Sequence, residues 1–133
     1  MPITAHFETK ISNKPIMKRI LTILFVTLFL CNLSAQVQTT ARVTYYNLVG
    51  KTASGVKTHR GVCAVSRDLE RMGFKIGEKV YVEGYGTFQI LDRTAARLKK
   101  TVDIWLPKGK PTLNGKKFVN GKGVKIRLIY DND

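Results

Sequence analysis

Short apolar-rich segments, separated by polar and glycine-containing stretches, recur along the chain after residue 40. The clearest is 124–130 (VKIRLIY), in which apolar side chains recur at every second position, as in a strand with one buried face. Other segments rich in Val, Ile, Tyr, Phe and Thr are residues 41–47, 61–66, 79–83, 87–91 and 101–106. Six short strands favour a closed barrel, because closure leaves no open sheet edge. The predicted fold class is therefore all-β, a six-stranded barrel.

Two further segments interrupt this strand pattern. Residues 67–72 are predicted to form one or two helical turns that end at Gly73, because glycine readily takes the left-handed conformation that terminates helices. Residues 107–123 (PKGKPTLNGKKFVNGKG) are rich in lysine and glycine. We expect a solvated, mobile loop there, and the alternative is a basic rim that attracts an acidic glycan.

The N-terminal part of the chain has the pattern of an export signal. An apolar run of eleven residues, 20–30, directly follows two basic residues and would span roughly 16 Å, about half of a bilayer core. Together with Ser34 and Ala35 it predicts a signal peptide over 1–35, cleaved after Ala35. We expect translation to start at Met17 and the protein to be exported, periplasmic or extracellular, without a stable membrane anchor. The alternative is an uncleaved N-terminal anchor.

The mature chain, 36–133, is long enough for one domain. Its charge indicates the kind of partner to expect. The whole chain has 23 Lys and Arg against 9 Asp and Glu, a net charge of +14. Removing the leader takes away four cations and one acid, which leaves +11. So basic a domain is expected to meet an anionic polymer or surface. Export argues against a nucleic acid as that partner.

Cysteine and histidine point to no cofactor. Cys63 is the single cysteine after residue 35, so an intramolecular disulfide is excluded. It lies in an apolar run and is predicted to be a buried, inert thiol. His59 stands in a polar stretch and is expected to be exposed. With no second histidine or cysteine pair in the mature chain, we predict no metal site and no cofactor.

Five phrases occur in a characteristic order and spacing: TASG at 52–55, AV at 64–65, GEKVYVEGYG at 77–86, DRT at 92–94 and DIW at 103–105. Together they resemble the three-aspartate (3D) domain. This is a double-psi β-barrel related to the rare lipoprotein A family and to the C-terminal barrel of membrane-bound lytic transglycosylase A. The resemblance covers about residues 41–130 and implies a double-psi barrel.

The chain also departs from the family pattern. Ser66 stands where the family has its first aspartate, and Thr94 is followed by alanines where the family has glycines. About four extra residues lie between Ser66 and Gly77. Asp92 and Asp103 match the second and third family aspartates, eleven positions apart.

The resemblance implies cleavage of peptidoglycan glycan strands. In lytic transglycosylases the sugar's own 6-hydroxyl attacks, so one carboxyl group can serve as acid and then as base. The resemblance gives that catalytic role to Asp103, with Asp92 as its neighbour. Residues expected to contact the substrate are Thr52, Ser54, Ser66, Tyr85 and Trp105.

Acid catalysis sets a physical condition on Asp103. A free aspartate has a pKa near 3.9 and is ionised at neutral pH, so burial or a carboxylate within about 6 Å must raise the pKa. The alternatives are that Asp92 caps a turn and that Asp103 forms an ion pair with Arg93 or Arg97. Tyr85 and Trp105 are alternatively core residues.

Three functional hypotheses follow. The first is a lytic transglycosylase-like enzyme, and the second is a non-catalytic peptidoglycan-binding or regulatory module on the same barrel. The third, a nucleic-acid binder, is disfavoured by export. We expect peptidoglycan glycan strands as the partner and a monomeric protein.

Overall fold

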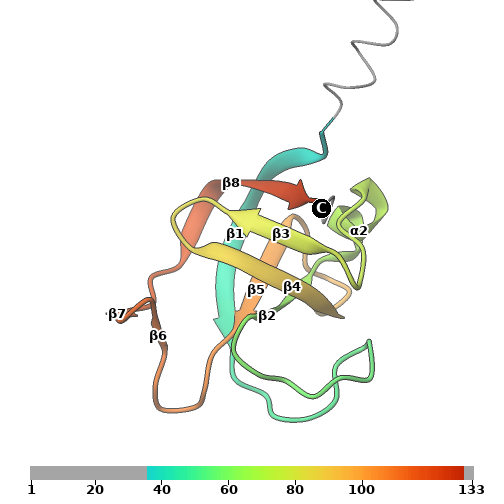
Figure 1. Cartoon of the computed structure of the whole chain (residues 1–133). Coiled ribbons are helices and arrows are strands. Elements are labelled where there is room, and N and C mark those ends of the chain that lie inside the picture. The colour runs from blue at the N-terminus through green and yellow to red at the C-terminus, as the bar shows by residue number, and fades with distance from the viewer. Residues whose placement is uncertain (1–35, 131–133) are drawn as a thin grey trace, which may run out of the picture. The chain divides into compact units, whose positions relative to one another are not determined.

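The computed structural model describes residues 36–130, so the predicted signal peptide (1–35) and the start at Met17 lie outside the described residues. Six strands form a closed barrel in the order β1-β5-β2-β4-β3-β8 (Figure 1). Their bounds are β1 (Gln38–Tyr46), β2 (Val62–Val65), β3 (Lys79–Val82), β4 (Gly86–Arg93), β5 (Thr101–Trp105) and β8 (Gly121–Ile129). The predicted all-β, six-stranded barrel is confirmed, and each predicted segment overlaps one of these strands.

The barrel mixes parallel and antiparallel neighbours. β1 runs parallel to β5, and β2 runs parallel to β4, whereas the other four neighbouring pairs are antiparallel. This mixture agrees with the double-psi barrel that the resemblance implies. It places β2 between β4 and β5, the two strands that carry the predicted acids.

Side chains alternate between the barrel interior and its outer surface, as strand geometry requires. The interior is filled by residues such as Val43, Val65, Ile90 and Ile104. Cys63 belongs to this core and is fully buried, and burial raises the pKa of its thiol. The prediction of a buried cysteine is confirmed.

The short helix α2 (Arg67–Met72) lies between β2 and β3. It ends at Gly73, whose φ of 123° lies in the range that side chains disfavour. Leu69 and Phe74 are buried against the barrel core. The predicted helical turn is therefore confirmed at its predicted bounds. No helix within residues 36–130 is long and apolar enough to cross a membrane.

The lysine-rich segment 107–123 differs from the solvated loop predicted for it. It contains a two-stranded hairpin, β6 (Thr112–Leu113) with β7 (Lys116–Lys117). Phe118 is buried, with its ring centroid 5.2 Å from that of Tyr45 and 5.4 Å from that of Tyr85. The lysines are exposed, but one aromatic side chain anchors the segment to the barrel. The polar composition of this segment gave no indication that Phe118 would be buried.

Candidate functional site

Asp92 and Asp103 lie on the two strands that flank β2, and both pair in register with Ala64. Cys63, which precedes Ala64, faces the core, so Ala64 faces outward by alternation. Residues aligned across a sheet share a face. A register shift before Ala64 brings Asp92, rather than its neighbour Leu91, opposite this alanine. The two predicted acids therefore lie on the same outer face of the barrel, on either side of Ala64.

Asp92 is held by three donors. The backbone N–H groups of Ala53 and Arg93 donate to Oδ1 over 3.0 and 2.9 Å. The phenol of Tyr46 donates to Oδ2 over 3.4 Å. The bond from Arg93 joins adjacent residues of β4, whereas an Asx turn uses a donor two residues on. The bond from Ala53 ties Asp92 to the loop that precedes β2.

Asp103 has a different environment. Its Oδ1 accepts a hydrogen bond from the hydroxyl of Thr44 over 2.9 Å. Its Oδ2 has no hydrogen-bond partner among residues 36–130 and retains contact with solvent. Burial raises the pKa of Asp103, and the negative charge of Asp92 raises it further, against the lowering effect of Thr44. An acid catalyst needs a raised pKa and an oxygen that a substrate can reach. The pKa of Asp103 is shifted in the required direction, and its Oδ2 contacts solvent.

Thr44 and Tyr46 contact the acids but were not among the predicted site residues. Both stand on β1, where Thr44 pairs with Asp103 and Tyr46 with Trp105. Burial raises the pKa of the Tyr46 phenol, and the charges of Asp92 and Asp103 add to this effect. The signal in the sequence was the row of polar positions that alternate with core residues in this strand. Only the strand pairing shows which acid each one meets.

Neither acid is paired with an arginine in the described part of the chain. Arg93 binds Glu70 instead, with Nε–Oε2 and Nη2–Oε1 distances of 2.7 and 2.9 Å. The proposed ion pairs of Asp103 with Arg93 or Arg97 are therefore absent among residues 36–130. No positive side chain bonds to either carboxylate there.

The predicted loop residues Thr52 and Ser54 lie beside Asp92. Thr52 is buried, and its hydroxyl donates to the Val56 carbonyl and lies 2.7 Å from the Ser54 hydroxyl. Ser54 is exposed, and its backbone N–H donates to the carbonyl of Leu91 over 3.0 Å. These bonds tie the loop to β4 next to the acid. Of the two hydroxyls, that of Ser54 is on an exposed residue.

The other three predicted substrate contacts are placed differently. Trp105 shares the outer wall with Asp103, but it packs with Val62 and Leu91, and its indole N–H donates to the Leu48 carbonyl over 2.8 Å. Ser66 is fully buried, and its hydroxyl accepts from the backbone N–H of Thr101. The structure gives both side chains packing or bonding partners within the protein.

Tyr85 lies on another part of the barrel. Its phenol donates to the carbonyl of Val119 over 2.7 Å, and its ring packs against Phe118. It anchors the lysine-rich segment and has no contact with Asp92 or Asp103. The structure does not bring it to the acids.

The outer wall therefore combines one carboxyl group of raised pKa with one carboxylate fixed by backbone donors. Within residues 36–130, no three His, Cys, Asp or Glu side chains are grouped so that they could hold a metal ion. The chemistry available to the pair is to donate and recover a proton at Asp103.

Comparison with known proteins finds a structural likeness alone. No family model and no curated protein matches the chain. A solved papain inhibitor from Streptomyces is similar over 70% of this chain and 94% of its own, with a TM-score of 0.49 and 15% identity. A likeness at this level carries no functional argument. The three-aspartate resemblance rests on the sequence phrases.

Proposed function

We propose that the protein is exported to the cell wall and cleaves peptidoglycan glycan strands in the manner of a lytic transglycosylase. The observation that carries the proposal is the environment of Asp103. This side chain has a raised pKa, an oxygen that reaches solvent and a second carboxylate beside it. Two neighbouring carboxyl groups in unlike environments are typical of acid–base sites.

In the proposed reaction, Asp103 donates its proton to the glycosidic oxygen as the bond from that oxygen to the anomeric carbon breaks. The 6-hydroxyl of the same sugar attacks that carbon, and its proton passes to Asp103, which is thereby restored. No water is consumed, and the product ends in an anhydro ring. Positive charge develops on the sugar in the transition state, and in this proposal the carboxylate of Asp92 stabilises it.

Hydrogen bonds from neighbouring side-chain and backbone groups hold Asp92 and Asp103 in place. Thr44 fixes Oδ1 of Asp103 and leaves Oδ2 for the substrate. The backbone N–H groups of Ala53 and Arg93 fix Asp92. Tyr46 is half-buried, and its phenol donates to Oδ2 of Asp92.

A non-catalytic peptidoglycan-binding module is the second candidate. The observation that favours it is Ser66, which occupies the place of the family's first aspartate and is buried without access to a ligand. The acid pair then lacks a third carboxylate. The packed position of Trp105 also leaves little ring surface for sugar stacking.

The test is incubation of residues 36–133 with purified murein, followed by mass spectrometry of the soluble products. We expect anhydro-muropeptides from the wild type and at least about 100-fold less from Asp103→Asn, the loss typical of removing a general acid. Glu78→Gln is the matched control, because Glu78 is an exposed acid outside the site.

Each outcome of this experiment decides between the two candidates. Murein that binds the wild-type protein but yields no anhydro product supports the binding module and overturns the enzyme. Product that forms equally with Asp103→Asn overturns the assignment of the acid. Absence of both binding and product rejects both functions.

A further inference from the structure

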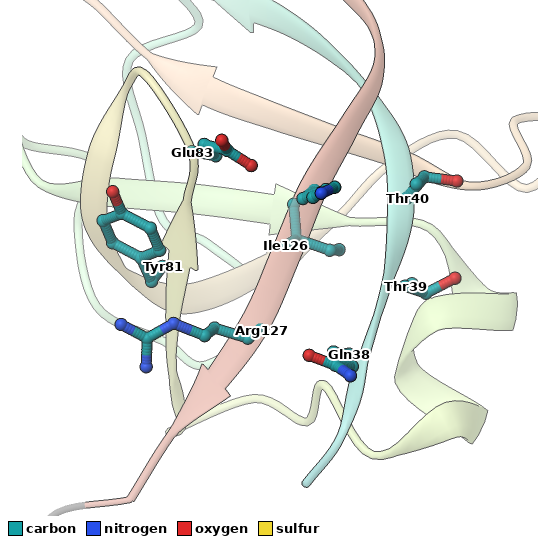
Figure 2. Close-up of a pocket in the computed structure, with 8 residues that line it drawn as sticks. Gln38, Thr39, Thr40, Tyr81, Glu83, Ile126 and Arg127 are labelled. Carbon is teal, nitrogen blue, oxygen red and sulfur yellow. The ribbon is translucent and has the colours of Figure 1, made fainter.

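A hollow lies on the outer surface of three neighbouring strands, away from the acids. Its volume is about 380 Å³, and β1, β8 and β3 form it (Figure 2). Gln38, Arg127 and Tyr81 stand in one row across these strands. Thr40 pairs with Lys125 on the neighbouring strand. The lining includes a single acid, Glu83.

A second hollow of about 280 Å³ shares Thr40 with the first. It is lined by Arg42 and by three lysines, Lys99, Lys100 and Lys122, and no acid lines it. Both hollows are lined by residues of β1 and β8, and they share Thr40. We call the two hollows together the seam groove.

Among the described residues, the cations of the seam groove have no carboxylate in an ion pair with them. Within residues 36–130, the side chains of Arg42, Lys99, Lys100, Lys122 and Lys125 form no ion pair. All five residues are exposed. The nearby Asp68 accepts from the backbone N–H of Lys100 and leaves the ammonium group free. The groove therefore holds uncompensated positive charge.

The chemistry of these groups suits phosphate. Four cations surround the smaller hollow, and a phosphate group offers more acceptor oxygens than a carboxylate to share among them. Along β8, Lys125 and Arg127 are two positions apart on one face, about 7 Å at the usual strand rise. A chain of negative groups laid along the groove would thus meet cations repeatedly.

Other anionic partners fit less well. Membrane binding draws on apolar side chains, but the exposed large apolar residues lie outside both hollows. Single-stranded nucleic acid binds by stacking bases on aromatic rings. Tyr81, the aromatic residue of the groove, is already covered by Arg127, whose guanidinium carbon lies 4.8 Å from the ring centroid.

We propose that the seam groove binds a linear polymer of phosphate groups that carries no bases. This site is separate from the acid pair and does not depend on the proposed cleavage. β1 connects the two, since Gln38, Thr40 and Arg42 line the groove and Thr44 and Tyr46 contact the acids. A polymer bound in the groove would hold the protein on an anionic matrix.

The test is binding of inorganic polyphosphate of defined length to residues 36–133 by calorimetry at several salt concentrations. The groove variant carries Arg42→Gln, Lys122→Gln and Lys125→Gln. The matched control carries Lys51→Gln, Lys57→Gln and Lys75→Gln, which removes the same charge at exposed positions outside the groove. Thermal unfolding verifies that both variants fold.

We expect the groove variant to bind at least about tenfold more weakly than the control variant. The slope of log affinity against log salt concentration should become less steep by about 2, since each of the three lost contacts reduces the slope by about 0.7. Equal weakening in both variants, or no binding by the wild type, would overturn the proposal. So would tighter binding of single-stranded DNA, polyglutamate or anionic vesicles at matched charge.

Discussion

Glu70 binds the guanidinium of Arg93 at two points, with distances of 2.7 and 2.9 Å. Arg93 directly follows Asp92, so Glu70 engages the cation closest in sequence to the acid pair. Arg93 also lowers the pKa of Glu70, chiefly through its hydrogen bond. The ion pair between α2 and β4 thus binds the guanidinium of Arg93 to Glu70, and no ion pair joins Arg93 to Asp92 within residues 36–130.

Substitution Glu70→Gln should lower the pKa of Asp103. Without the Glu70 carboxylate, Arg93 is free to approach Asp92 and to offset the negative charge that raises the pKa of Asp103. The measurement is a titration of the Asp103 carboxyl carbon by NMR, which needs no activity. The double variant Glu70→Gln/Arg93→Gln should restore the wild-type value. An unchanged titration in Glu70→Gln would show that Arg93 does not influence the pair.

Substitution Asp103→Asn should stabilise the protein at neutral pH while it removes the proposed activity. Asp103 holds its proton to higher pH in the folded state than in the unfolded chain, because burial raises its pKa. Its contribution to stability is therefore complete below the ordinary carboxyl pKa and is lost as pH rises through the raised value. The asparagine side chain does not ionise, so the Asp103→Asn variant does not lose stability in this way as pH rises.

Thermal unfolding of wild type and Asp103→Asn at pH 3.5 and pH 7 checks this expectation. The Tm of the variant minus the Tm of the wild type should be larger at pH 7 than at pH 3.5. A difference that is the same at both values would contradict a raised pKa. In the wild type, cleavage should also decline as pH rises through that pKa, because the proton donor is lost.

Substitution Asp92→Ala should lower the free energy of unfolding by about 1–2 kcal/mol, because the N–H groups of Ala53 and Arg93 lose their acceptor. It should also lower the pKa of Asp103 by removing a neighbouring charge. Urea unfolding and the same NMR titration measure the two effects. Asp92→Asn keeps one acceptor oxygen and should reproduce the pKa change with a smaller loss of stability.

Substitution Phe118→Ala should release the hairpin of β6 and β7 from the barrel. The ring of Phe118 packs against Tyr45 and Tyr85, and removing a buried phenylalanine costs about 3 kcal/mol. Hydrogen exchange should quicken in residues 107–120 and remain slow in β2 and β5. Uniform quickening across the barrel would mean that this side chain supports the whole fold.

Local sequence patterns indicated the six barrel strands and the helix, but not the hairpin of β6 and β7. Segments rich in β-forming residues marked the strands, alternation was clearest in β8, and Gly73 marked the end of the helix. These features depend on backbone preferences and on burial of one strand face, which act over a few neighbouring residues. The two acids were identified on other grounds, from short phrases that resemble the three-aspartate domain.

The sequence alone established which segments form strands and which carboxyl groups are candidates, but the assembly of the site depended on tertiary structure. The contact of Thr44 with Asp103 joins residues 59 positions apart, and that of Tyr46 with Asp92 joins residues 46 apart. Such contacts follow from the order and register of the strands. A register shift beside Ala64 decides which side chain of β4 faces Asp103. Closure of the barrel likewise carries Tyr85 away from the acids, because side-chain direction and strand pairing are set by packing over the whole domain.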